Sequence, residues 1–305
     1  SVLTNNGSGV FTAQTATVAG AEPSDLAVAD VDGMTGLDLV VTNRSANTFT
    51  VLLNNGSGVL TASSAVSTVG AMPSSVAVAD IDQDGDQDVA VITSADNMLR
   101  VFLQGPIGTF SAQTPIATGT DPSRLRTGLL NNDLVPDLVV VNQQSNNVTV
   151  VLNNSSGTLN LAAPTTFATR VSGETLALAD FNRDGFTDIV TGGEESSDLA
   201  LLLNDGMGAF GGPILFPLDD TLPIEIAPIT LNADGDIDLV ITDDAFPDIV
   251  LVTNTFGSHT LFLGAGQDVS GFNFANRNIN LAPVLTVPGA QTVDEDVTLT
   301  FDSSA

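Results

Sequence analysis

The sequence predicts an all-β fold built from repeated four-stranded sheets, and three observations support this prediction. A closing aspartate recurs at an almost constant step, at Asp38, Asp88, Asp137, Asp188 and Asp238, which are 50, 49, 51 and 50 residues apart. An amide residue that follows a short aliphatic run keeps the same step, at Asn5, Asn54, Gln104, Asn154, Asn204 and Asn254. No window of about 11 residues or more shows the 3.6-residue spacing of apolar positions that marks a helix. Two registers that hold over successive periods indicate a true repeat.

Each period contains four expected strands, described here for the second unit. The first spans 76–79, the second spans 89–92, the third ends at the amide residue, and the fourth spans 113–118. They are short, rich in Val, Leu, Ile and Thr, and bounded by Gly, Asn, Asp or Pro clusters. A four-stranded sheet about every 50 residues is typical of a β-propeller blade. A β-solenoid is the alternative, but its coils are much shorter than this period.

We expect a propeller over residues 1–281, followed over 282–305 by a linker and the opening strands of a second module. Residues 1–20 supply only the last two strands of a blade, because Asn5 matches the amide position and no acidic segment precedes it. Five complete blades are expected, at about 21–70, 71–119, 120–171, 172–221 and 222–265. The ring is either truncated, or smaller and closed by pairing of its end strands, for which Gly271 to Ile279 is a candidate.

Two segments of the repeat carry a family resemblance. Residues 79–91, Ala-Asp-Ile-Asp-Gln-Asp-Gly-Asp-Gln-Asp-Val-Ala-Val, and the Asn-Asn-Gly-x-Gly turn at 54–58 resemble the FG-GAP or VCBS repeat of integrin-α-type β-propellers. The resemblance covers about residues 1–265. From Ala282 onward the sequence resembles the opening strands of a bacterial cadherin-like or Ig-like domain. The first resemblance implies a calcium-loaded, extracellular propeller used for adhesion or as a scaffold in large surface proteins.

The acidic segments between the first and second strands are candidate calcium sites. Calcium takes six to eight hard oxygen ligands, and a tight loop with Gly at its bend turns alternate side chains inward. In the family pattern the ligands are side chains at loop positions 1, 3, 5 and 9 and the main-chain carbonyl at position 7. This pattern implies two matching sites, Asp80, Asp82, Asp84, Asp86 and Asp88 in the second unit and Asp180, Asn182, Asp184, Phe186 through its carbonyl and Asp188 in the fourth. Turn chemistry alone explains one Asp-Gly loop, but not closely spaced carboxylates that repel one another without a cation.

Three further loops depart from this pattern. The first unit keeps Asp30, Asp32 and Asp38, but its ligand set is incomplete because Met34 at position 5 offers no hard oxygen. The fifth unit keeps Asn232, Asp234, Asp236 and Asp238, with the weaker neutral oxygen of Thr230 at position 1. The third unit has Leu129 at position 1 and keeps only Asn131, Asp133 and Asp137, so we expect a metal-free loop there. Bound calcium is expected to hold the first two strands of a blade together, so that the apo protein is less stable.

The composition excludes several classes of partner. The chain has 36 Asp plus Glu against 7 Lys plus Arg, a net charge of −29 and no Cys. A field of this sign repels phosphate, so nucleic acid and anionic membranes are poor partners, and thiolate metal sites and disulfides are impossible. The apolar runs are far shorter than the ~20 residues that cross a bilayer, so no membrane insertion is expected. An acidic surface suits secretion into a salty, calcium-bearing medium, which favours an extracellular or cell-surface location.

We expect no catalytic role, because His259 is the single histidine and a lone loop histidine is usually solvated. A carbohydrate-binding, lectin-like or polysaccharide-degrading propeller is the competing interpretation. Sugar sites usually stack on Trp or Tyr, which this chain lacks, and Phe11, Phe110 and Phe210 recur with the period and are expected in the core. Adhesion or scaffolding is therefore the leading interpretation, with a protein or glycan surface as ligand. The partial blade and the terminal strands also allow a homo-oligomer or filament to form by strand exchange.

Overall fold

The computed structural model describes residues 2–254, except for 15–16, 35, 69, 71, 107, 155–156, 219–220 and 245–248. Every element in these residues is a β-strand, and no helix there is long and apolar enough to cross a membrane. The predicted all-β class is therefore confirmed. The expected closing strand at 271–279, the expected module at 282–305 and His259 lie outside the described residues.

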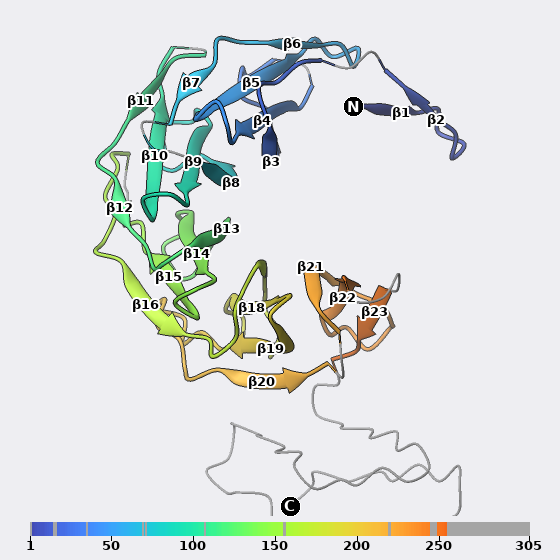
Figure 1. Cartoon of the computed structure of the whole chain (residues 1–305), viewed down its shortest axis with the longest axis vertical. Helices are drawn as coiled ribbons and strands as arrows, with labels where there is room; N and C mark the ends of the chain where they lie inside the picture. The colour runs from blue at the N-terminus through green and yellow to red at the C-terminus, as the bar shows by residue number, and fades with distance from the viewer. Residues whose placement is uncertain are drawn as a thin grey trace, which may run out of the picture. The chain divides into compact units, whose positions relative to one another are not determined.

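Six antiparallel sheets follow one another along the chain (Figure 1). The half-blade consists of β1 (Leu3–Asn5) and β2 (Phe11–Ala13). Blade 1 contains β3 (Pro23–Ala29), β4 (Asp38–Asn43), β5 (Thr48–Asn54), β6 (Leu60–Ala62) and β7 (Val66–Ser67), and blade 2 contains β8 (Pro73–Ala79), β9 (Asp88–Thr93), β10 (Met98–Gln104), β11 (Phe110–Ala112) and β12 (Ile116–Ala117). Blade 3 contains β13 (Pro122–Gly128), β14 (Asp137–Asn142), β15 (Asn147–Val151) and β16 (Thr165–Ala168), and blade 4 contains β17 (Thr175–Ala179), β18 (Asp188–Gly193), β19 (Ser196–Leu202) and β20 (Ile214–Pro217). Blade 5 contains β21 (Pro223–Ile229), β22 (Asp238–Asp243) and β23 (Ile249–Val252).

Within each blade, consecutive long strands pair with each other, so in blades 1 to 4 the fourth strand lies farthest from the first, and in blade 5 the described residues form the first three strands. In blade 2 this fourth strand differs from the prediction, because the expected strand at 113–118 is replaced by the two short strands β11 and β12, both paired with β10. Pro115 lies in the interruption, where it offers no N–H for a ladder hydrogen bond. Blade 1 has the same division, with β6 and β7 both paired with β5.

The hydrophobic core lies between neighbouring blades. Val40 and Phe49 of blade 1 pack with Val76, Val89 and Phe102 of blade 2, and similar clusters join blades 2 and 3, blades 3 and 4, and blades 4 and 5. Successive residues of a strand point to opposite faces of the sheet, so one set of apolar side chains meets the preceding blade and the alternate set meets the following one. This double burial explains why the second and third strands are almost continuous runs of aliphatic residues.

The three phenylalanines that recur with the period differ in burial. Phe210 is buried, and Phe110 is partly buried with its ring centroid 5.3 Å from that of Phe49. Phe11 is 60% exposed, so its predicted place in the core is wrong. Phe11 belongs to the half-blade, whose sheet lacks a first and a second strand.

Candidate metal centre

The acidic segments form the loops between the first and second strands of the five blades, as Asp30–Asp38, Asp80–Asp88, 129–137, Asp180–Asp188 and 230–238. We number their residues from position 1 to position 9. The loops share a turn geometry, because the side-chain oxygen at position 3 accepts a hydrogen bond from the N–H at position 5. These bonds measure 2.9 Å at Asp32, 3.3 Å at Asp82, 3.1 Å at Asn131, 3.0 Å at Asn182 and 2.8 Å at Asn232.

In blades 2 and 4 the backbone of the loop adopts left-handed conformations at positions 4 and 6. In blade 2 these are Gln83 and Gly85, with φ of 60° and 98°, and in blade 4 they are Arg183 and Gly185, with φ of 58° and 90°. Glycine adopts this conformation without steric cost, which accounts for the Gly of the motif. These left-handed residues give the sharp bends that the sequence predicted for a tight acidic loop.

The closing aspartate at position 9 is fully buried in all five blades, and both of its carboxylate oxygens accept backbone N–H groups. One oxygen accepts from position 2 of its own loop, at 2.8–3.0 Å. The other accepts from the amide residue at the end of the third strand or two residues beyond it, at 2.7–2.9 Å. The closing aspartate therefore fastens the loop to the third strand even in blade 3, where no metal is expected.

In blades 2 to 5 this amide residue also connects neighbouring blades. Its side-chain nitrogen donates to the carbonyl at position 2 of the preceding loop, from Gln104 to Val31, Asn153 to Ile81, Asn204 to Leu130 and Asn254 to Phe181, at 2.6–2.8 Å. In blade 3 this residue is Asn153 and not Asn154, the position predicted from the repeat. Sequence reasoning missed the function of the amide, although its constant 16-residue distance from the closing aspartate was a signal for it.

In each of two loops, three carboxylates lie close together. Oxygens of Asp80, Asp82 and Asp88 lie within 4.8 Å of one another, and so do oxygens of Asp30, Asp32 and Asp38. In the blade 2 group, Oδ1 of Asp80 is buried and accepts no hydrogen bond from the described residues. A buried carboxylate oxygen without a partner is costly, and a calcium ion is the type of partner that such oxygens accept. Both groups therefore fit a cation.

The electrostatics of blade 2 agree with this fit. Burial raises the pKa of Asp88 to about 6, against the opposing effect of its backbone hydrogen bonds. Burial and the charges of Asp84 and Asp80 also raise the pKa of Asp82. The charged forms of these carboxylates are thus disfavoured when no cation is bound, and a cation would relieve this cost. Asp84 and Asp86 complete the predicted ligand set; the N–H of Asp86 donates to Oδ1 of Asp84 at 2.9 Å.

In blade 4 the predicted ligands are engaged in local hydrogen bonds. Asp180 accepts from the N–H groups of Asp184 at 3.2 Å and Gly185 at 2.9 Å, and the amide of Asn182 donates to Asp184 at 2.8 Å. The N–H of Phe186 donates to Asp184 at 2.9 Å. Burial raises the pKa of Asp188 to about 6, as it does that of the equivalent Asp88. Blade 4 therefore has the loop geometry of blade 2, with its oxygens partly satisfied by the protein.

Blade 5 differs because a neighbouring arginine enters the loop. Arg183, at position 4 of the blade 4 loop, pairs with the buried carboxylate of Asp236 at 2.6 Å and also donates to the carbonyl of Asp234. Asp234 and Asn232 keep the turn bonds of the other loops. The guanidinium group thus supplies positive charge at a loop in which the sequence predicted calcium ligands.

In blade 3 an apolar residue takes the place of a ligand. Leu129 stands at position 1 and is exposed, whereas Val135 at position 7 is buried. The side chains of Asn131 and Asp133 accept turn bonds from the N–H groups of Asp133 and Val135. Burial raises the pKa of Asp137, as for the other closing aspartates with a resolved shift. The metal-free loop expected here stays a prediction.

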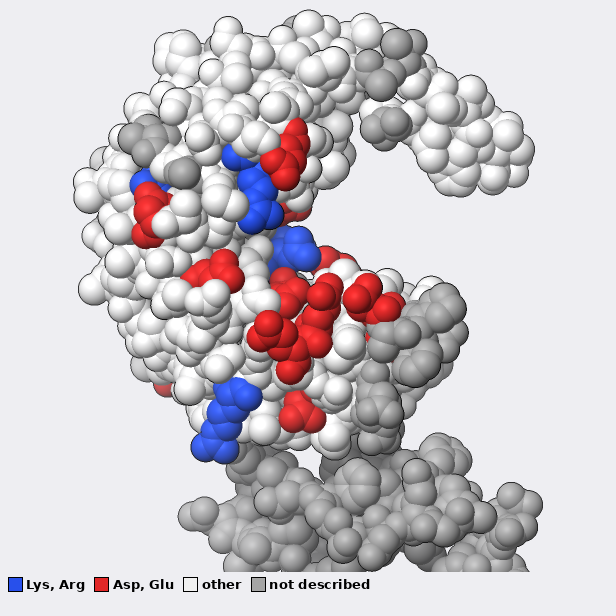
Figure 2. All heavy atoms as spheres, viewed as in Figure 1, with Lys and Arg blue, Asp and Glu red and all other residues white. Residues whose placement is uncertain are grey.

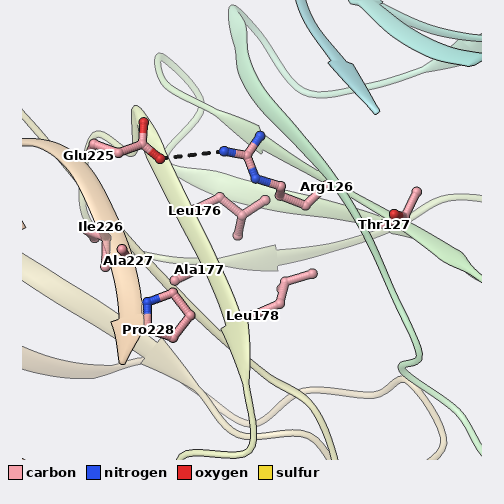
Figure 3. A pocket seen from close by; sticks show the side chains of 9 residues that line it. All are labelled: Arg126, Thr127, Leu176, Ala177, Leu178, Glu225, Ile226, Ala227 and Pro228. Atoms are coloured by element: carbon pink, nitrogen blue, oxygen red, sulfur yellow. Dashed lines mark hydrogen bonds and ion pairs between the residues drawn. The ribbon is translucent and has the colours of Figure 1, made fainter. Parts of the chain in front are cut away.

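Charged groups also occur away from the loops. On the face drawn in Figure 2, acidic side chains are more prominent than basic ones. Burial, followed by the charges of Glu194 and Glu195, raises the pKa of Glu174. A pocket lined by residues of β13, β17 and β21 carries Arg126 and Glu225, whose side chains point toward each other (Figure 3).

Glu225 also pairs with Arg124 at 3.0 Å, and its distance to Arg126 is 3.5 Å. These ion pairs connect β13 of blade 3 with β21 of blade 5. The single carboxylate of Glu225 is thus shared by two arginines, of which Arg126 lines the pocket. Arg124, Arg126 and Glu225 therefore form a link between blades.

Comparison with known proteins agrees with this geometry. The model of the FG-GAP-like repeat matches four overlapping segments, residues 36–91, 80–140, 130–191 and 180–241. No curated protein matches the chain.

Among solved structures, a protein from Lactobacillus plantarum is 17% identical, with a TM-score of 0.52 over 83% of this chain and 76% of that one. A protein from Desulfotomaculum acetoxidans is 13% identical, with a TM-score of 0.51 over 76% of this chain and 69% of that one. A lectin from Agrocybe aegerita that recognises non-reducing terminal N-acetylglucosamine is 17% identical, with a TM-score of 0.49 over 83% and 74% of the two chains. At these identities the likeness concerns the fold alone.

Proposed function

This chain belongs to the FG-GAP-like repeat family, and from that premise we propose that it is a calcium-stabilised β-propeller serving as an adhesion or scaffold module of an extracellular protein. The observation that carries the calcium part is the group of Asp80, Asp82 and Asp88, with the buried and unpartnered Oδ1 of Asp80. The group of Asp30, Asp32 and Asp38 supports a second site.

Calcium would act here as a structural ion. In blade 2 it would be held by Asp80 and Asp82 in the loop and by Asp88 at the start of β9, so it would join the ends of β8 and β9. The protein would fix the conformation of the loop, because the left-handed residues and the turn bonds position the ligand oxygens before an ion binds. Binding to the folded state alone stabilises it by about 2.7 kcal/mol at a free calcium concentration 100-fold above Kd.

The scaffold role is supported by the way the blades are joined. Each interface combines an apolar cluster with a side-chain hydrogen bond from one blade to the carbonyl of the preceding loop. Neighbouring blades thus pack against each other, and the turns between strands are where a partner would bind. The strongly acidic chain and the need for calcium favour an extracellular medium, where this ion is abundant.

Calcium titration with a matched pair of variants tests the metal proposal. We expect the chain to bind calcium and to melt at a lower temperature in chelator. Asp82→Asn, in a predicted site, should weaken calcium binding, whereas Asp133→Asn, in the loop expected to be metal-free, should leave it unchanged. Absence of bound calcium, together with equal melting temperatures in calcium and in chelator, would refute the proposal. A glycan array tests the role separately, since specific glycan binding would replace scaffolding by carbohydrate recognition.

A further inference from the structure

A repeated hydrogen bond connects the first strands of neighbouring blades. The first strand lies at the edge of its sheet, so its outward N–H groups need an acceptor from another part of the chain. A side chain of the preceding first strand is this acceptor. The bond runs from the N–H of Val76 to Asp25 at 3.1 Å, from that of Leu125 to Ser75 at 3.3 Å and from that of Ile226 to Thr175 at 3.0 Å. One position of the first strand therefore satisfies the inner edge of the next blade.

This series of acceptors is interrupted between blades 3 and 4. By the strand registers, Arg124 occupies the acceptor position of blade 3, and the N–H that it should accept is that of Leu176. A guanidinium group has only donors, so Arg124 cannot take this role. Its Nη2 instead donates to Glu225 of blade 5 at 3.0 Å. Its Nε is buried and meets no acceptor among the described residues. This part of the structure therefore has an excess of hydrogen-bond donors.

Arg126 adds a second guanidinium group, two residues further along β13 and on the same face of this strand. Its Nη1 donates to the carbonyl of Leu125 at 3.0 Å, and its Nη2 lies 3.5 Å from Glu225, at the outer limit of a hydrogen bond. Two guanidinium cations and one carboxylate leave one positive charge in this group. The group is therefore locally cationic in a chain whose net charge is −29.

These charged groups lie at a pocket of about 390 Å³ between the first strands of blades 3, 4 and 5. This volume is within the range of small-molecule sites. Arg126 and Glu225 lie at one end of the pocket, and Leu178 and Pro228 lie at the other (Figure 3). Leu176 is among the lining residues between them, and the described lining contains no aromatic ring. The pocket therefore has a cationic end and an aliphatic end.

We propose that this pocket binds a small organic carboxylate with an aliphatic body. The carboxylate would supply acceptor oxygens to Arg124, Arg126 and the N–H of Leu176, since guanidinium groups bind carboxylates through paired hydrogen bonds. The aliphatic walls favour a hydrocarbon body, because buried sugar hydroxyls would lose their hydrogen bonds to water. Salt screens the remaining acidic residues beyond about 10 Å at 0.1 M, so the local donors determine binding. The site shares no residue with the acidic loops and goes beyond the proposed scaffold role.

Ligand-observed NMR titration of the full chain, in calcium-containing buffer, tests the site with three probes of the same ring size. Cyclohexanecarboxylate has the carboxylate and the aliphatic body, cyclohexanecarboxamide lacks the charge, and glucuronate has hydroxyl groups in place of the hydrocarbon surface. We expect saturable binding of cyclohexanecarboxylate with a Kd of about 1 mM or lower. The amide and glucuronate should each bind about tenfold more weakly, because the first loses the charged hydrogen bonds and the second loses the apolar contact.

Two variants should change this affinity in opposite directions. Arg126→Gln removes a lining cation and should weaken binding about tenfold, whereas Glu225→Gln removes the competing carboxylate and should strengthen binding about threefold. Arg44→Gln removes an exposed arginine elsewhere and, as the matched control, should leave the affinity unchanged. Thermal melts check that each variant is folded, which is expected because both pocket side chains are more than a third exposed. Absence of saturable binding by the unchanged chain, equal binding of the amide or glucuronate, or weaker binding by Glu225→Gln overturns the proposal.

Discussion

Replacing Asp137 by alanine tests whether the closing aspartates are backbone clamps independent of metal. Asp137 is fully buried and accepts the N–H of Leu130 and the N–H of Asn153, each at 2.8 Å. Alanine leaves both N–H groups buried without an acceptor, and each unsatisfied donor costs about 1–3 kcal/mol of stability. Burial raises the pKa of Asp137 because the charged carboxylate is poorly solvated. Removing the carboxylate also removes this desolvation cost, which offsets part of the cost of the two unpaired N–H groups. We expect a net decrease of about 2–4 kcal/mol in the free energy of unfolding.

The measurement is urea denaturation followed by far-ultraviolet circular dichroism, because the chain has no Trp and no Tyr to report by fluorescence. Asp133→Ala is the matched control, since this residue of the same loop is exposed and accepts one N–H, from Val135 at 3.0 Å. Its loss should cost about 1 kcal/mol or less. Equal denaturation midpoints for Asp137→Ala and Asp133→Ala would refute the clamp. In blade 2, Asp88→Ala removes a clamp and a proposed calcium ligand, so its deficit should be larger in calcium than in chelator.

Two further predictions concern packing and pH. Leu125→Ala should lower the free energy of unfolding by about 2–5 kcal/mol, because Leu125 is fully buried between blades 2 and 3. Leu26→Ala, at the equivalent but exposed position in blade 1, should change it by about 0.5 kcal/mol or less. Similar urea midpoints for the two variants would contradict the inter-blade core. Burial alone would raise the pKa of Asp96, but hydrogen bonds from Arg100 and Thr93 lower it below its ordinary value of 3.8. A lowered folded-state pKa gives stability that is present above the unfolded-state pKa and is lost as pH falls through the folded-state pKa. Asp96→Asn should therefore lower the free energy of unfolding at neutral pH by about 1 kcal/mol, a modest effect because the Asp96 side chain is 39% exposed. It should also reduce the loss of stability at acid pH. If urea titrations at several pH values show the same loss at acid pH for both chains, the contribution of the Asp96–Arg100 pair is refuted.

The sequence by itself determined the period, the strand class and the acidic loops. These features follow from local rules: aliphatic runs of strand length, Gly and Asn at turns, and carboxylates at alternate positions of one loop. The same rules predicted that Asp80, Asp82 and Asp88 lie together, because all three belong to one short segment. They did not distinguish Asn153 from Asn154, since both follow the same aliphatic run.

The tertiary structure decided which groups satisfy each other across blades. The amide of Asn153 donates to the carbonyl of Ile81, 72 residues earlier in the chain. Arg183 pairs with Asp236 of the next blade, and Arg124 pairs with Glu225 across an intervening strand. None of these pairings follows from sequence spacing within one loop, because each depends on how one sheet packs against the next. Leu26 and Leu125 occupy the same place in the repeat and differ in burial for the same reason. A strand pattern specifies which face is apolar, but only the presence of a neighbouring blade removes that face from water.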